Sequence, residues 1–324
     1  MPNILIAASF PPELLLRQTP ASQGCWGDFR FVTDPGQTDL AGCVVYDDLV
    51  EPLELVCPAG NTLLITGEPE SLRSYRSRFT HQFGQVWTSH ESIQHARKTR
   101  RNEAQHWHYG LYAGQAHGRS LDFDNLVTLP RPKKSKRMSV ICSAKAHSED
   151  HRQRLVFVEQ LKEALGDSID VFGRGVRSID DKSDAIYDYQ YHIVLENDHS
   201  DFFMTEKLAD AFLGYSYPIY FGGPEAYHRY PEGSFTSIDI YRPAQAIATI
   251  RAVLEADCYA NSRGQLDEAR RRVLYDNNLC SMLAEHFSQT LVNRPAQRVR
   301  LVPKKHRAEL VWKLVQKQLR RNAA

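Results

Sequence analysis

Short apolar segments of the kind that form buried strands alternate with more polar segments along most of this 324-residue chain. In the first half, these segments are Ile4–Ala8, Cys43–Tyr46, Leu63–Thr66 and Val86–Thr88. Parallel strands are buried on both faces and need long crossover connections. The alternation therefore predicts an α/β domain built on a parallel sheet.

The clearest unit of this pattern spans residues 62–88. An apolar run is followed by a turn at Gly67-Glu68-Pro69, and then by apolar residues spaced as on one face of a helix. The residues with this spacing are Leu72, Tyr75, Phe79 and Phe83. We therefore expect a strand, a helix and a second strand, with Glu68 at the carboxyl end of the first strand, where doubly wound folds bind ligands.

A basic segment that contains prolines, residues 131–137, interrupts the alternation, and its like charges favour a solvated connector. After it we expect strands at 138–142, 169–172, 191–195 and 218–221, and helices at 151–165 and 205–214. The chain length suits two domains better than one. The predicted organisation is a first α/β domain over residues 1–130, the linker 131–137, a second α/β domain over 138–292, and a basic amphipathic helix over 293–324.

Composition limits the partners of such a protein. The chain has 40 basic and 39 acidic residues, so bulk charge gives no reason to expect a nucleic-acid partner. The six cysteines form no C-x-x-C pair, which favours reduced thiols and argues against a structural zinc site. The apolar run near the N-terminus is too short for a signal peptide or a membrane span, so we expect a cytoplasmic protein.

The C-terminal tail has a composition of its own. From Arg294 onward it carries ten Lys and Arg residues against one acidic residue. An apolar stripe accompanies this charge, formed by Leu310, Val311, Leu314 and Val315. The stripe predicts either peripheral contact with an anionic membrane or packing of this helix against the first domain.

Polar residues gather between a predicted strand and a predicted helix, at residues 196–208. The start of a helix offers unpaired N–H groups and the positive end of a dipole to a phosphate. Thr205 is a suitable N-cap, and Lys207 adds a positive charge beside the same position. Lys207 therefore either faces a bound pyrophosphate or pairs with Glu206 or Glu196.

The spacing of these residues resembles glycosyltransferase family 10, the α1,3/α1,4-fucosyltransferases. The matching residues are Glu196-Asn197, Thr205-Glu206-Lys207 and Pro218-Ile219-Tyr220-Phe221-Gly222. Ser143, Arg154 and Asp170-Val171-Phe172-Gly173 resemble an upstream block of the same family. The resemblance covers about residues 140–239 strongly, and it extends weakly to residues 64–69.

The resemblance implies a fold, a reaction and a set of site residues. It implies two Rossmann-like domains facing a cleft (GT-B type) and an inverting transfer from a GDP-sugar, most simply GDP-fucose, to a glycan. Arg154 and Lys207 would face the diphosphate. In a site without a metal, such fixed cations stabilise the negative charge of the diphosphate. The other implied donor contacts are Ser143, Gly173, Glu196, Asn197, Phe203, Thr205 and Glu206. No cofactor and no essential metal are expected.

Glu68 is our candidate for the general base, because inversion in one displacement needs a carboxylate to take the acceptor proton. Glu70 is the alternative, and Glu68 could instead cap the following helix. In the family the base follows a strand in a comparable setting, which favours Glu68.

Other features are departures from the family or weaker signals. Phe203 stands where many members have a tyrosine hydroxyl, and Asp198 stands where serine is usual, so the identity of the sugar is open. Asp122-Phe123-Asp124 has a metal-binding D-x-D form, but chance explains so short a match. His106-Trp107-His108 predicts a polar loop with a packed tryptophan, and in a fold of this type the loop would contact the acceptor. The rival functions are a transferase of the same fold with another nucleotide-sugar, and a catalytically silent binding protein.

Overall fold

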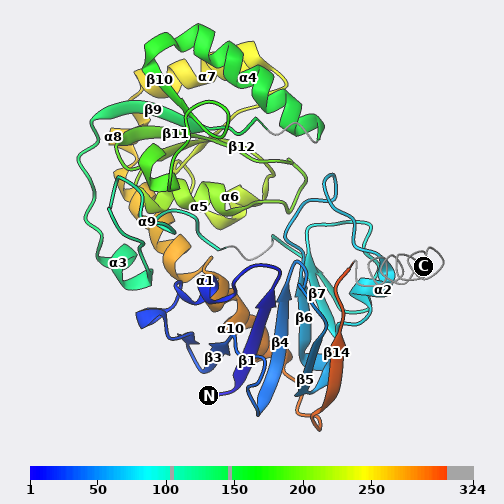
Figure 1. The fold of residues 1–324 in the computed structure, drawn as a ribbon. Helices are drawn as coiled ribbons and strands as arrows, with labels where there is room; N and C mark the ends of the chain where they lie inside the picture. The colour runs from blue at the N-terminus through cyan, green and yellow to red at the C-terminus, as the bar shows by residue number, and fades with distance from the viewer. Residues whose placement is uncertain (103–105, 145–147, 305–324) are drawn as a thin grey trace, which may run out of the picture.

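The computed structural model describes residues 1–102, 106–144 and 148–304 of the chain. These residues form two α/β lobes, which are drawn one above the other in Figure 1. Each lobe contains its own parallel sheet, in agreement with the fold class expected from the alternating apolar segments.

The first lobe is built on a seven-stranded sheet. In spatial order its strands are β2 (Cys25–Trp26), β3 (Phe29–Val32), β1 (Asn3–Ala8), β4 (Leu40–Tyr46), β6 (Thr62–Ile65), β7 (Gln85–Thr88) and β8 (Lys98–Arg100). Only β2 and β3 pair antiparallel within this sheet of the described chain; the other neighbours are parallel. Two short helices, α1 (Glu13–Leu16) and α2 (Ser77–Thr80), belong to its connections.

Both faces of this sheet are covered, which explains why its strands are apolar without interruption. Ile4 and Ile6 of β1 belong to a buried cluster with Phe287 of helix α10 (Leu279–Thr290). Leu5 lies between them in the strand and belongs to the cluster on the opposite face. The second face also carries a separate two-stranded antiparallel sheet of β5 (Leu53–Cys57) and β14 (Gln297–Leu301).

The second lobe is built on a five-stranded sheet in which every described pair is parallel. In spatial order its strands are β10 (Ile169–Phe172), β9 (Lys136–Ile141), β11 (Tyr189–Leu195), β12 (Tyr217–Phe221) and β13 (Thr236–Ser237). Its helices are α3 (Phe123–Thr128), α4 (Glu149–Leu165), α5 (Glu206–Leu213), α6 (Glu225–Arg229), α7 (Pro243–Glu255), α8 (Cys258–Asn261) and α9 (Arg263–Tyr275). The sequence predicted the first four strands, α4 and α5 at nearly these positions.

The two hydrophobic cores divide the chain differently from the predicted boundaries. Trp107, Leu121 and Leu126 are buried in the core of the second lobe, although they precede the basic segment 131–137. That segment therefore does not link two domains, although Lys133 and Ser135 are exposed as expected. The Lys134 ammonium is an exception to the predicted solvation, because it donates hydrogen bonds to the carbonyl oxygens of Ile186 and Tyr187 at 3.1 and 2.7 Å. A lysine in a charged segment of the sequence does not show that its ammonium contacts carbonyl oxygens more than 50 residues away.

The end of the chain returns to the first lobe. Helix α10 packs on the large sheet of that lobe, and β14 pairs with β5. The predicted helix over residues 293–324 is therefore wrong for 297–301, where basic and apolar residues alternate as in a strand with one buried face. Leu301 is 0% exposed. The apolar stripe at 310–315 lies outside the described residues.

The segment after β6 is a second correction. A continuous helix was predicted from Leu72 to Phe83, but the structure has an irregular loop followed by the single turn α2. Tyr75, Phe79 and Phe83 are buried as their spacing suggested. The Tyr75 hydroxyl donates to Asp47 and accepts from the Gly67 N–H, which anchors the loop without a helix.

Two further properties bear on the expectations from composition. All six cysteines are free thiols. Among the helices of the described residues, none combines the length and the apolar character that crossing a membrane requires.

Candidate active site between the lobes

A cavity of about 700 Å³ lies between the two lobes. It opens where strands β4, β6, β9 and β11 end, because the residues that follow them line it: Asp47, Glu68, Ser143 and Asn197. Doubly wound folds bind their ligands at this edge of the sheet. The other lining residues are Phe10, Tyr46, Gly67, Leu72, Arg73, His106, His108, Ile141, His151, Arg154, Lys182, Met204, Thr205, Glu206 and Lys207.

Glu196 organises the beginning of helix α5. Its fully buried carboxylate accepts hydrogen bonds from the Thr205 N–H at 2.7 Å and from the Thr205 hydroxyl at 2.7 Å. Thr205 stands at the N-cap position as predicted, but its side chain makes no capping bond because Glu196 engages the hydroxyl. Glu196 itself does not line the cavity. It therefore supports the site from behind.

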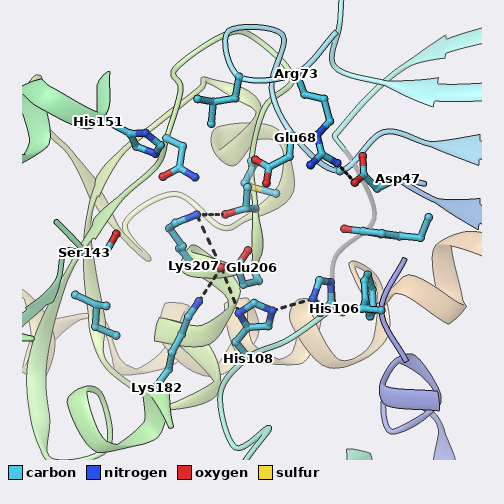
Figure 2. Close-up of a pocket in the computed structure, with 18 of the residues that line it drawn as sticks. Asp47, Glu68, Arg73, His106, His108, Ser143, His151, Lys182, Glu206 and Lys207 are labelled. Carbon is cyan, nitrogen blue, oxygen red and sulfur yellow. Dashed lines mark hydrogen bonds and ion pairs between the residues drawn. The ribbon is translucent and has the colours of Figure 1, made fainter. Parts of the chain in front are cut away.

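Lys207 points into the cavity from the first turn of α5 (Figure 2). Its ammonium donates to Glu196 Oε2 at 3.0 Å and to the Thr205 hydroxyl at 2.8 Å, so the pairing that the sequence left open does occur. An ammonium has three N–H groups. Glu206 Oε1 lies 3.8 Å from the ammonium, beyond hydrogen-bond distance, so one donor of Lys207 can serve a ligand beside the N–H groups of the helix terminus.

Arg154 presents a different kind of cation to the cavity. It lies on α4, is 4% exposed, and donates to neutral oxygens: Asn197 Oδ1 at 2.6 Å and the carbonyl of Leu195 at 3.3 Å. No carboxylate lies within 4.0 Å of its guanidinium, and its Nε lacks a hydrogen-bond partner, among the described residues. Burial lowers the pKa of Arg154. The site therefore contains a buried positive charge that calls for an anion.

Glu206 belongs to a buried network of charges. The Lys182 ammonium lies 2.7 Å from Glu206 Oε1 and 2.7 Å from Asp210 Oδ2. Burial disfavours a charged Lys182, but the two carboxylates outweigh it and raise its pKa. Burial likewise opposes a charged Glu206, whose pKa is nevertheless lowered by Lys182 and Lys207. Glu206 is therefore a carboxylate at neutral pH.

This network coincides with a possible metal site. Ligating atoms of His108, Glu206 and Asp210 lie within 4.8 Å of one another. The Lys182 ammonium already contacts both carboxylates. It supplies the positive charge that a cation would bring, so this donor set fits a metal poorly.

Glu68 lies on the side of the cavity formed by the first lobe, facing Lys207 (Figure 2). Burial raises the pKa of Glu68, against the opposing charges of Arg73 and Lys207. Its peptide oxygen is fixed by a 2.7 Å hydrogen bond with His90 Nε2. Glu70 is exposed, accepts a bond from the Glu91 N–H at 3.0 Å, and does not line the cavity. Of the two carboxylates, only Glu68 is in contact with the site.

Asp47 anchors the surroundings of Glu68. It accepts hydrogen bonds from Arg73 and from the Tyr75 hydroxyl, and the Lys304 ammonium lies 3.3 Å from its Oδ1. Burial alone would raise the pKa of Asp47, but Tyr75, Lys304 and Arg73 together lower it. Sequence reasoning missed this residue. The sequence did contain a sign of its role, because Asp47 follows the apolar run 43–46 just as Glu68 follows the apolar run 63–66.

His106 and His108 form an aromatic wall with Phe10. Burial lowers the pKa of each histidine to about 4, so both rings are neutral at neutral pH. Their Nε2 atoms lie 2.8 Å apart, which requires one ring to donate and the other to accept. The Phe10 ring stacks on His106 with the centroids 5.1 Å apart. Trp107 is 1% exposed, in agreement with the predicted packed tryptophan.

The structure places seven of the ten predicted site residues on the cavity: Glu68, Ser143, Arg154, Asn197, Thr205, Glu206 and Lys207. Glu196, Phe203 and Gly173 are not among its lining residues. Phe203 is 1% exposed. A Cβ at Gly173 would lie 2.2 Å from the carbonyl oxygen of Cys142, so this glycine permits a close approach of backbone segments. Arg73 and Lys182 are cavity residues for which the sequence gave no signal.

Two acidic features of the sequence have structural roles. Asp198 accepts hydrogen bonds from the Ser71 hydroxyl and from the Ser200 N–H, which joins the loop after β11 to the loop that carries Glu68. In Asp122-Phe123-Asp124, Asp122 caps α3 and Asp124 accepts from the Ala21 N–H. Neither aspartate of the D-x-D lines the cavity.

Comparison with solved structures identifies the architecture. An α1,3-fucosyltransferase crystallised with GDP superposes with a TM-score of 0.50 at 16% sequence identity, over 90% of this chain and 91% of that one. A structure of α1,3-fucosyltransferase with GDP-fucose gives the same score and identity, over 90% and 92% of the two chains. No curated protein sequence matches the chain. The two lobes and the cavity between them form a GT-B fold.

The sequence of the second lobe is also similar to that of a known family. Residues 132–261 match the model of a family described as glycosyltransferase family 10 (fucosyltransferase), C-terminal domain. The matched part, less than half of the chain, is similar to that family and contributes Arg154, Asn197, Glu206 and Lys207 to the cavity. Together with the GT-B fold, this match indicates a glycosyltransferase.

Proposed function

We propose that this glycosyltransferase moves fucose from GDP-fucose to a hydroxyl group of a glycan, with inversion in a single displacement. One observation carries the proposal. A buried guanidinium that has no carboxylate partner among the described residues and the start of a helix line one side of the cavity, and a carboxylate with a raised pKa lines the other. The first side suits a diphosphate leaving group, and the second suits a base.

The second lobe would hold the donor. Arg154 has no carboxylate partner among the described residues, and the start of α5 adds N–H groups and the remaining donor of Lys207. These groups oppose the negative charge that develops on the diphosphate as its bond to the sugar breaks. Asn197, which accepts from Arg154, together with Ser143 and Glu206, would contact the nucleotide or the sugar. Similar structures contain GDP and GDP-fucose.

Glu68 would act as the general base. The acceptor oxygen attacks the anomeric carbon while the bond from that carbon to the diphosphate oxygen breaks. The hydroxyl proton moves to the Glu68 carboxylate, and GDP leaves as an anion. A raised pKa suits this role because a stronger base accepts the proton more readily, provided that it is deprotonated at the working pH.

We propose that the reaction needs no metal. Lys182 pairs with Glu206 and Asp210 at the cluster that resembles a metal site, and the D-x-D residues are engaged elsewhere. Fixed cations of the chain then carry the electrostatic stabilisation of the leaving group. Turnover is expected to survive prolonged treatment with a chelator.

Phe203 bears on the choice of sugar. Its buried side chain does not line the cavity. Replacing tyrosine by phenylalanine at this position therefore removes no hydroxyl from the residues that line the cavity. The presence of Phe203 is therefore no argument against fucose as the donor sugar. A catalytically silent binding protein is disfavoured by the position of Glu68 in the cavity.

The first lobe would hold the acceptor, with the stacked rings of Phe10 and His106 available to a sugar face.

We further propose a cytoplasmic enzyme whose tail touches an anionic membrane. Residues 305–324 contain six Lys and Arg residues, one glutamate and Trp312, a residue at home in the membrane interface. Truncation after Lys304 retains β14 and should abolish binding to anionic vesicles, which high salt should also reverse. Undiminished vesicle binding by the truncated protein would reject this role.

A matched pair of variants tests the proposed reaction. Glu68→Gln keeps the shape of the side chain but cannot take a proton, so transfer of fucose from GDP-fucose to a glycan mixture should fall about a hundredfold or more. Its affinity for GDP should stay unchanged. Glu70→Gln is the control, because Glu70 is outside the cavity, and should retain full turnover. Loss of turnover in Glu70→Gln but not in Glu68→Gln would show that Glu70, and not Glu68, is the base.

A further inference from the structure

A second cavity, of about 310 Å³, lies in the first lobe between the edge of the large sheet and helix α10. Trp87 of β7 and Lys98 of β8 line it from the sheet, and His286 lines it from α10. It shares no lining residue with the cavity between the lobes. The remaining lining residues are Gln85, Arg97, Thr99, Arg101, Glu285, Gln289 and Thr290.

Three buried nitrogen atoms on the side chains that line this cavity have no hydrogen-bond partner within the described part of the chain. They are Trp87 Nε1, Arg101 Nε and His286 Nε2. Trp87 is 0% exposed, so its indole N–H cannot be satisfied by bulk solvent. Burial, together with the charges of Arg101 and Arg97, lowers the pKa of His286 to about 4. The imidazole is therefore neutral and can present an N–H at Nε2.

Arg101 brings a charge as well as a donor. Its guanidinium stacks on the Trp87 ring with 4.3 Å between Cζ and the ring centroid. No carboxylate of the described residues lies within 4.0 Å of it, and burial lowers its pKa to about 10. Arg101 is partly buried and its Nε is fully buried, so the charge is partly desolvated, which is unfavourable unless a ligand supplies an anionic partner.

The neighbouring cations, exposed Arg97 and partly buried Lys98, have no carboxylate partner within 4.0 Å in the part of the chain that the structure describes. Arg97 and Lys98 donate to carbonyl oxygens, those of Gly60 and Glu91, each at 3.0 Å. Glu285 is the acidic residue among those lining the cavity; it is exposed on α10, and its charge opposes the lowering of the Arg101 pKa without coming within 4.0 Å of the guanidinium. Three cations and two neutral N–H donors thus surround a space with one carboxylate at its rim.

We propose that this cavity binds an oxyanion, a phosphate or carboxylate group. An oxyanion accepts several hydrogen bonds at once, so it pairs with the Trp87, Arg101 and His286 donors and compensates the Arg101 charge. A buried water would satisfy one or two donors but would leave the charge uncompensated. On the lobe assigned to the acceptor, the oxyanion would be a substituent of the acceptor glycan; this last step rests on the proposed function.

The indole N–H of Trp87 is a direct reporter of such binding. Its resonance in a nitrogen–proton correlation spectrum is assigned in the full-length wild-type protein and followed during titration with inorganic phosphate. Ionic strength is kept constant with chloride, because screening alone weakens any surface attraction. We expect a saturable shift of the Trp87 resonance. The Lys207→Ala protein should give the same shift, since Lys207 lines the other cavity.

Two variants tie the shift to the charge. Arg101→Gln should weaken the apparent affinity for phosphate about tenfold or more, because it removes a charge-assisted contact. Arg78→Gln removes the same charge from an exposed position on α2 and should leave the affinity unchanged. Thermal unfolding of each variant checks that it is folded, and Arg101→Lys, which keeps the charge, should bind phosphate more tightly than Arg101→Gln.

The ligands compared in the titration separate the sources of the anion. Hexose 6-phosphate or a hexuronate binding more tightly than inorganic phosphate, with no shift from neutral hexose, supports an acceptor substituent. Equal affinity for inorganic phosphate and hexose phosphate supports a free anion and rejects the acceptor source. A Trp87 resonance that none of these anions moves, or that neutral hexose moves equally, overturns the inference. None of these outcomes depends on fucose transfer.

Discussion

Arg154 and Lys207 face the same cavity, but the protein compensates their charges differently. Lys207 is paired with the buried carboxylate of Glu196, whereas Arg154 has only neutral partners among the described residues. A ligand diphosphate would therefore relieve Arg154 more than Lys207. Charge-assisted contacts to a carboxylate or phosphate contribute about 1.5–3 kcal/mol.

Arg154→Ala should thus weaken GDP binding about ten- to a hundredfold, as measured by titration calorimetry. Arg152→Ala is its control, because Arg152 lies on the same helix but is exposed and pairs with Glu149 at 2.6 Å. Lys207→Ala should also weaken donor binding, though it additionally leaves Glu196 buried without a cation. If Arg154→Ala and Arg152→Ala bind GDP equally well, Arg154 does not contact the diphosphate.

The pKa of Glu68 provides a second test at this scale. Arg73 lowers that pKa against the effect of burial, so Arg73→Gln should raise it further. A general base works when deprotonated, and a higher pKa moves the acidic limb of kcat/KM to higher pH. The plateau above this limb should persist. Arg76→Gln, at an exposed position of the same loop, should leave the profile in place; an unmoved limb in Arg73→Gln would contradict the assignment of Glu68.

At the scale of elements, β14 joins the end of the chain to the first lobe. Leu301 is 0% exposed and belongs to the buried cluster on the face of the large sheet opposite α10. Leu301→Ala should lower the free energy of unfolding by about 2–5 kcal/mol, which chemical denaturation measures. Val299→Ala, at a partly buried position of the same strand, should cost less. Equal small losses in both would mean that β14 is not part of the core.

The sequence predicted the elements whose pattern is local. Strands β1, β4, β6 and β7 are continuous apolar runs, and α5 has the period of a helix, so each was predicted near its observed place. Strand β5 alternates in burial and pairs with a segment more than 200 residues away, which a local pattern does not show. The loop after β6 has the apolar spacing of a helix but is held by Tyr75 and Asp47 instead.

The same distinction explains what was found of the site. Glu68, Asn197 and Lys207 lie directly after strands or at the start of a helix, where position alone suggests contact with a ligand. Lys182 and Arg73 were missed because their roles depend on carboxylates distant in the sequence: Glu206 and Asp210 for Lys182, and Asp47 for Arg73. Conversely, Gly173 matched the family pattern but lies behind the cavity wall.

At the scale of the whole molecule, the cavity exists only because the two lobes are held together. The chain passes from the first core to the second between Ile93 and Trp107, and it returns between Leu274 and Leu279. Asn278 fixes the return by donating to the carbonyl of Gln18 at 2.7 Å. The contact between Ser71 and Asp198 adds a link beside the site. The proposed donor site of the second lobe therefore lies opposite Glu68, the proposed base of the first lobe.

Thermal unfolding of the wild-type protein with a panel of nucleotides tests the central claim most directly. A ligand that binds only the folded state stabilises it by about 2.7 kcal/mol at a hundred times its Kd. GDP and GDP-fucose should raise the melting temperature, and UDP and UDP-sugars at the same concentrations should not. A rise with UDP-sugars and none with GDP or GDP-fucose would contradict the assignment of the cavity to a GDP-fucose donor.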